Sequence, residues 1–131
     1  MQENYLRKLL RKTDSLEREA FIDLEWGCFN KAASALYFAL RYMATILLEL
    51  RGAPYPRRDD KFANTIKAQG VPEVAQALRR LYDLRKIADY SDNDVKRQEI
   101  DGVMSFYQKA KNVLQNAIRK ELSKKRISKA Y

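Results

Sequence analysis

The sequence predicts an all-α protein, an up-and-down four-helix bundle with one additional short helix. Apolar residues recur at steps of three and four over long stretches of the chain, which is the period of an amphipathic helix. No stretch shows the alternating pattern of a strand, and no internal repeat is found. The 131 residues have the length of a single domain.

The first predicted helix spans residues 4–25, and Gly27 suits its end. Its apolar positions are Leu6, Leu9, Leu10, Thr13, Leu16, Ala20 and Leu24. The second helix, from Asn30 to Arg51, is apolar over so much of its circumference that we expect it at the centre of the bundle. Arg41 interrupts this apolar surface and could point into a cleft or an interface.

The residues 52–58, GAPYPRR, form a loop because they hold two prolines and a glycine. Asp59 or Asp60 can cap a short helix that runs to Lys67. The next helix starts at Pro72, which fits a first helical turn, and ends at about Tyr90.

The last helix is expected to follow the polar turn SDND, with Asp94 as its cap, and to run to about Leu122. A basic C-terminal tail begins at about residue 123. Its composition includes few large apolar residues, which disfavours an amphipathic membrane anchor.

The composition excludes many enzyme classes. The chain has no histidine, so it has no histidine-based triad, no histidine-bearing zinc site and no imidazole acid–base pair. Its four glycines form no phosphate-cradling loop. The net charge of +9 favours contact with nucleic acid, nucleotides or an acidic partner, although it is also compatible with solubility alone.

Cysteine usage and hydropathy point to a cytoplasmic location. Cys28 is the only cysteine and cannot form an internal disulfide, which fits a reducing compartment. We expect it to be a small buried hydrophobe rather than a nucleophile, because no histidine can activate it. The most apolar run, residues 32–50, is interrupted by polar residues, and the first residues lack the apolar core of a secretory signal.

The end of the fourth helix combines Arg85, Asp89 and Tyr90. A guanidinium on the inward side of a helix end is costly unless it is paired with an acidic group or used to bind a ligand. One interpretation is a nucleotide- or anion-binding corner, to which Arg41 also belongs: Arg85 faces phosphate, Asp89 orients it, and Tyr90 stacks or donates a hydrogen bond. The other is a plain i,i+4 ion pair with a tyrosine closing the helix end.

No metal is expected at this corner. Asp89, Asp92 and Asp94 lack the glycine and the terminal glutamate of a calcium-binding EF-hand loop.

Two stretches, taken together, resemble the HEPN domain family of short all-helical prokaryotic domains. They are AASALYFALRYMATILLELRG, residues 32–52, and LYDLRKIADYSDN, residues 81–93, and the resemblance covers nearly the whole chain. It implies a helical bundle that commonly forms a homodimer, with residues of the fourth helix facing a cleft between protomers. It also implies a minimal nucleotidyltransferase as partner, often in a toxin–antitoxin-like module.

Other members of that family are metal-independent ribonucleases that use an arginine followed, after a short spacer, by a histidine. Here the arginine is Arg85, but the histidine position holds Tyr90. Imidazole suits proton transfer because its ordinary pKa is about 6.5, whereas tyrosine, at about 10, needs a large downward shift. We therefore expect a non-catalytic, nucleotide- or nucleic-acid-associated module without a cofactor. The alternative is a divergent ribonuclease that uses Arg85 and Tyr90.

Five further basic residues are candidates for contact with nucleic-acid phosphates. They are Arg57 and Arg58 in the loop, and Lys124, Lys125 and Arg126 in the tail. Solvation alone also explains such residues, and a third possibility is an assembly module whose basic faces bind an acidic protein.

Overall fold

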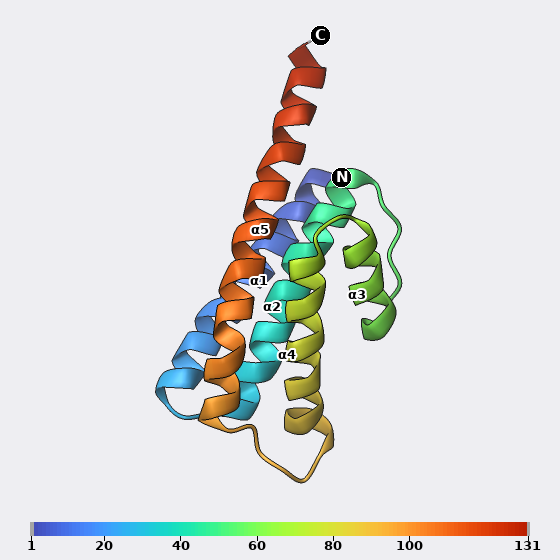
Figure 1. The fold of residues 1–131 in the computed structure, drawn as a ribbon. Helices are drawn as coiled ribbons and strands as arrows, with labels where there is room; N and C mark the ends of the chain where they lie inside the picture. Colours follow the sequence, from blue (N-terminus) through green and yellow to red (C-terminus); the bar gives the residue numbers. More distant parts are fainter. Residues whose placement is uncertain (1, 131) are drawn as a thin grey trace.

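The computed structural model describes residues 2–130, with side chains described up to residue 125. This part of the chain forms five helices and no strand (Figure 1). The long helices alternate in direction, and a short one lies beside them, which confirms the predicted all-α up-and-down bundle. The helices are α1 (Gln2–Glu25), α2 (Phe29–Arg51), α3 (Asp59–Ala68), α4 (Pro72–Tyr90) and α5 (Arg97–Ala130).

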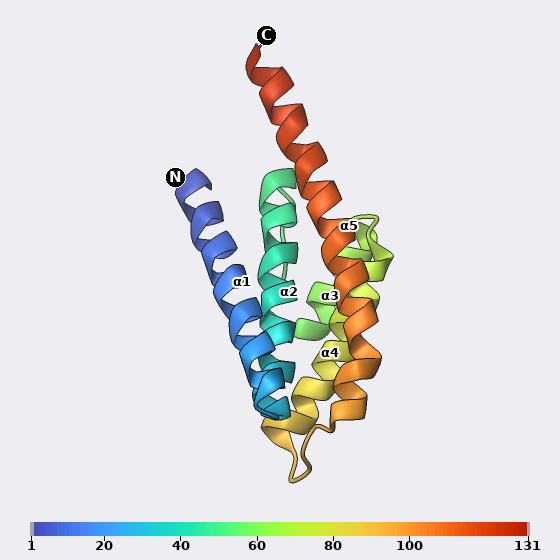
Figure 2. The same ribbon diagram turned by 90° about the vertical axis from the view of Figure 1, so that its left-hand side faces the viewer.

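The central helix is α2, which packs against α1, α4 and α5 (Figures 1 and 2). It is long and apolar enough to cross a membrane, but 72% of its most apolar window is buried inside the bundle. Burial against three neighbours requires apolar residues on nearly every side of a helix. Packing therefore accounts for the apolar character of α2, as predicted, while the cytoplasmic location stays a prediction.

Two helix starts differ from the predictions. Arg58 occupies the N-cap of α3, no side chain caps that helix, and Asp59 is its first residue. At the other site, Asp94 does not cap α5, because its carboxylate accepts a hydrogen bond from the Asn30 side chain at 2.9 Å. Instead Glu99, in the first turn of α5, accepts a hydrogen bond at Oε1 from the amide of Lys96, the residue before the helix, at 3.0 Å. Both predicted capping roles are wrong, since tertiary partners compete for short acidic side chains.

The last helix is longer than predicted. It continues through Ala130 rather than ending near Leu122, so the basic tail is part of α5 and projects beyond the other helices (Figure 1). Basic residues near a helix C-terminus interact favourably with the helix dipole, which is compatible with this continuation.

Cys28 lies in the turn between α1 and α2 and is exposed, so the prediction of a buried cysteine is wrong. The backbone explains its position: the Cys28 amide donates to the Asp23 carbonyl at 2.7 Å, and its carbonyl accepts from Ala32 at 3.0 Å. Cys28 is therefore part of the turn and not of the core. Gly27 just before it has φ of 74°, a left-handed conformation that favours glycine.

Candidate functional site

The predicted corner is built around an acid that the sequence suggested as a helix cap. Asp59, at the start of α3, lies with Oδ1 3.0 Å from Arg41 Nη1 and with Oδ2 3.3 Å from Arg85 Nη1. The Tyr37 hydroxyl donates a hydrogen bond to the same carboxylate. A single carboxylate therefore joins α2, α3 and α4. We call Arg41, Asp59, Arg85, Asp89 and Tyr90 the arginine corner.

Arg41 is committed to internal contacts. Its Nη2 donates to the carbonyl of Arg57 at 2.9 Å, and its guanidinium lies 3.9 Å from the centre of the Phe62 ring. Its Nη1 atom is buried and lies 3.0 Å from Asp59 Oδ1, but the two groups are not oriented for a hydrogen bond. The contact is therefore an ion pair without a directed hydrogen bond. It leaves one buried N–H group of the corner unsatisfied, which is costly.

Arg85 makes the i,i+4 ion pair with Asp89 that the sequence suggested, and it also contacts Tyr90 and Phe38. Its Nε donates to Asp89 Oδ2 at 3.1 Å, and its Nη2 donates to the Tyr90 hydroxyl at 3.3 Å. The guanidinium carbon lies 4.6 Å from the centre of the Phe38 ring, within cation–π range. Asp89 is held in turn by the Ser34 hydroxyl, at 2.9 and 3.0 Å from its two oxygens.

The charges of the corner balance, with two guanidinium groups facing two carboxylates. The side chains of Arg41 and Arg85 are only 16% and 15% exposed, whereas Tyr90 is 71% exposed. The surface of the corner is therefore an aromatic ring with the edge of a guanidinium beside it. An incoming phosphate would have to replace Tyr90 or Asp89 as the partner of Arg85.

The Tyr37 hydroxyl, which contacts the corner through Asp59, is not suited to proton transfer near neutral pH. Burial raises the pKa of Tyr37 above its ordinary value, and the hydrogen bond to Asp59 raises it further. Tyr37 is therefore a donor and not a base. No group of acidic or cysteine side chains in the described part of the chain could hold a metal ion.

Of the other predicted basic residues, the two in the loop lie beside the corner, because Arg41 donates to the Arg57 carbonyl and Arg58 precedes Asp59, whereas those of the tail lie apart from it. Arg57 and Arg58 are exposed in the loop before α3, and Arg58 pairs with Asp60 at 3.1 Å. Lys124 and Lys125 belong to the last turns of α5, which lie at the opposite end of the bundle from the end of α4 (Figure 1). The Arg126 side chain lies outside the described residues.

Sequence reasoning missed Asp59 and Ser34 as parts of this corner. An acid at the start of a short helix suggests capping first, and a serine within an apolar helix suggests only close packing. The available signal was Arg41, since an arginine on the apolar face of α2 needs a counter-charge that α2 itself does not supply.

The fold and the corner together define a small helical bundle with a charge-neutral arginine–carboxylate cluster joining three of its helices. No known family model matches the chain, and no curated protein is similar enough to it to count as a match. The resemblance to the HEPN family therefore stays a prediction.

Proposed function

We propose that this protein is a non-catalytic HEPN-type module that associates with a nucleotide or RNA through the arginine corner. As part of the same proposal, it forms a homodimer and works with a minimal nucleotidyltransferase in a toxin–antitoxin-like pair. The observation that carries the proposal is the hydrogen bond from Arg85 Nη2 to the exposed Tyr90 hydroxyl. It places a partly open guanidinium directly beside an accessible aromatic ring.

Each part of the corner has a role in this function. The exposed ring of Tyr90 offers a stacking surface for a base, an interaction that does not depend on base identity. Rotation of Tyr90 would free Nη2 of Arg85 to donate to a phosphate oxygen. The Ser34–Asp89 contact fixes the direction of the guanidinium. Arg57 and Arg58, in the loop before α3, add attraction for anions at longer range.

A non-catalytic role is supported by what the side chains of the corner can do. Cleavage of RNA without a metal requires a group that accepts a proton from the 2′-hydroxyl near neutral pH. Arg85 is a donor only, and Asp59 and Asp89 are both occupied by guanidinium groups. Binding requires none of these groups to change its protonation state.

Calorimetry with the four ribonucleoside triphosphates and a short single-stranded RNA tests the binding. Tyr90→Ala removes an exposed ring and is expected to weaken binding by about 5- to 150-fold, because stacking contributes about 1–3 kcal/mol per base. Arg80→Ala is the matched control, since Arg80 lies on α4 but contacts Phe106 instead of the corner. If the wild-type protein binds none of these ligands, the proposal is wrong.

Co-purification with the product of the adjacent gene tests the partner. A nucleotidyltransferase that elutes with this protein in gel filtration is the expected result. If the two proteins do not associate, the partner is wrong. Nucleotide binding would then still be tested by the calorimetry.

The second candidate function is a divergent metal-independent ribonuclease, which the 3.3 Å contact between Arg85 and Tyr90 favours. Incubation with RNA in the presence of a chelator tests it. Cleavage by the wild type that both Arg85→Ala and Tyr90→Phe abolish would establish the enzyme. Cleavage that persists unchanged in both variants comes from a contaminant.

A further inference from the structure

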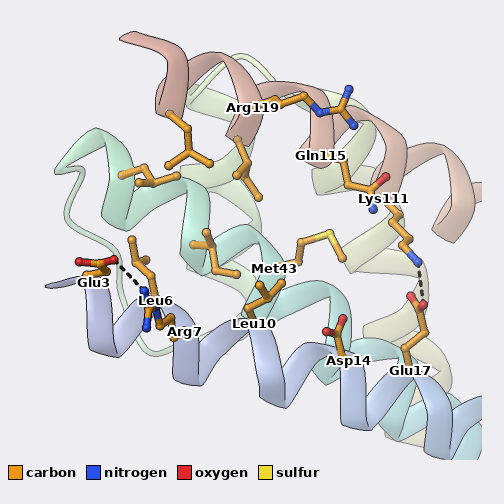
Figure 3. A pocket seen from close by; sticks show the side chains of 14 residues that line it. Glu3, Leu6, Arg7, Leu10, Asp14, Glu17, Met43, Lys111, Gln115 and Arg119 are labelled. Atoms are coloured by element: carbon orange, nitrogen blue, oxygen red, sulfur yellow. Dashed lines mark hydrogen bonds and ion pairs between the residues drawn. The ribbon is translucent and has the colours of Figure 1, made fainter. Parts of the chain in front are cut away.

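A groove of about 440 Å³ runs between α1 and α5, with α2 as its floor (Figure 3). It shares no residue with the arginine corner, which is formed by α2, α3 and α4. An inference about this groove is therefore independent of the proposed function.

The groove is apolar along its length. Met43, Ile46 and Leu50 of α2 form the floor, and Leu6 and Leu10 of α1 face Ile118 and Leu122 of α5 across it. Leu10 is 52% exposed and Leu122 also belongs to the exposed large hydrophobic residues. Continuous apolar surface of this kind on a folded chain marks an interaction site.

Polar contacts fix the walls of the groove at both of its ends. At one end, Gln2 Nε2 donates to the Glu49 carbonyl at 2.8 Å and fixes the start of α1 to α2. At the other end, Glu17 accepts hydrogen bonds from Lys111 and Tyr107, each at 2.6 Å, as Figure 3 shows for Lys111. The two walls are thus fixed to the bundle, and the groove is formed before anything binds.

The length of the groove suits a helix. At about 1.5 Å per residue, the wall from Glu3 to Glu17 is about 21 Å long and the wall from Lys111 to Leu122 about 17 Å. An amphipathic helix of about 11–14 residues has this length, and its apolar stripe can enter such a groove.

The rims of the groove carry charges of both signs. Asp14 on the α1 rim and Arg119 on the α5 rim make no ion pair among the described side chains. Because the chain carries a net charge of +9, it repels a basic helix. An acidic helix is attracted by the same charge.

We propose that the groove binds an amphipathic, net-acidic helix of a partner protein. The apolar stripe of that helix lies on Met43, Ile46 and Leu50, and its acidic flank faces Arg119. A basic residue on its other flank faces Asp14.

Two fluorescein-labelled synthetic helical peptides of about 14 residues test this inference. Both carry the same leucine stripe; one has glutamates on one flank and a single lysine on the other, and the second has lysines on both flanks. Fluorescence anisotropy is expected to show at least about tenfold tighter binding of the acidic peptide, the effect of a well-placed charge pair. Arg119→Glu is expected to reduce or reverse this preference.

Leu10→Asp places a carboxylate in the apolar wall and is expected to weaken binding of the acidic peptide by at least about tenfold. Ile22→Asp is the matched control, because Ile22 is an exposed residue of α1 that does not line the groove. Circular dichroism checks that each variant folds, and Arg119→Glu, a change on the exposed rim, tests the site if Leu10→Asp does not fold.

Four results would overturn the proposal. The first three are the absence of saturable binding by the acidic peptide, equal weakening by Ile22→Asp and Leu10→Asp, and equal affinity of both peptides for the wild type. A fourth is a wild-type dimer in gel filtration that Leu10→Asp converts to a monomer, since a second copy would then fill the groove.

Discussion

Asp59 lies 3.3 Å from Arg85, and this ion pair joins the first residue of α3 to the last turns of α4. The same carboxylate holds Arg41 and accepts a hydrogen bond from Tyr37, both on α2. The charged cluster therefore fixes where the short helix lies against the bundle, in addition to the apolar contacts of Phe62, which is buried. Such a cluster is sensitive to loss of one member, because the remaining charges stay partly desolvated.

Asp59→Asn is expected to destabilise the protein by about 2–3 kcal/mol. The change leaves Arg41 and Arg85 facing each other with their shared counter-charge removed, although Arg85 keeps Asp89. Denaturant unfolding followed by circular dichroism measures the effect. Asp60→Asn is the matched control, because Asp60 is a neighbouring exposed acid that pairs only with exposed Arg58, and no measurable loss is expected there. Equal stability of the two variants would contradict a structural role for the Asp59 cluster.

The same Asp59→Asn change is expected to increase affinity for anions at the corner. Asp59 competes with an external phosphate for the guanidinium of Arg85, so its neutralisation should tighten ATP binding by about three- to tenfold at low ionic strength. Calorimetry at two salt concentrations measures this. Asp83→Asn changes the net charge equally at an exposed site on α4, where Asp83 pairs with Lys86. If both variants gain equally, the gain comes from net charge and not from the corner.

The buried tyrosines predict a loss of stability in alkali. Burial raises the pKa of Tyr37, as do the hydrogen bond and the charge of Asp59, and burial followed by contact with Glu17 raises that of Tyr107. The folded chain therefore holds these protons more tightly than the unfolded chain, in which tyrosine has a pKa of about 10. Their contribution to stability is complete below about pH 10 and is lost progressively as the pH rises above it.

Ultraviolet absorbance and circular dichroism, recorded together against pH, measure this effect. Tyrosinate from Tyr37 and Tyr107 is expected to form only as helix content falls. Tyr107→Phe should make the stability fall less steeply above about pH 10, because one linked proton is removed. Ionisation of all eight tyrosines before any loss of helix would be the opposite outcome.

The helices could be predicted from the sequence because each depends on a period that local residues define. The central position of α2 and the Arg85–Asp89 pair follow from the spacing of residues in one helix. The role of Asp59 could not be predicted in the same way, because its partners Arg41 and Arg85 lie 18 and 26 positions away along the chain. Asp94 and Cys28 were mispredicted for a related reason, since the turns at the bundle end decide their surroundings.

Asn30 is the residue that fixes the loop between α4 and α5, although the sequence suggested only that it begins a helix. Its Oδ1 accepts a hydrogen bond from the Val95 amide at 2.8 Å, and its Nδ2 donates to Asp94 Oδ1 at 2.9 Å. Val95 is buried, so its amide has little access to water as a replacement acceptor. The side chain of Asn30 thus holds the start of α2 and the loop before α5 together.

Asn30→Ala is expected to cost about 2 kcal/mol, because it leaves the amide of buried Val95 without an acceptor. Asn30→Asp keeps that acceptor but replaces the donor to Asp94 with a second carboxylate, so it is also expected to destabilise the protein. Hydrogen exchange at Val95 and denaturant unfolding measure both effects. Asn93→Ala changes the same loop at an exposed residue and should leave both measurements unchanged. Fast exchange at Val95 in the wild type would show that the Asn30 contact does not hold this loop.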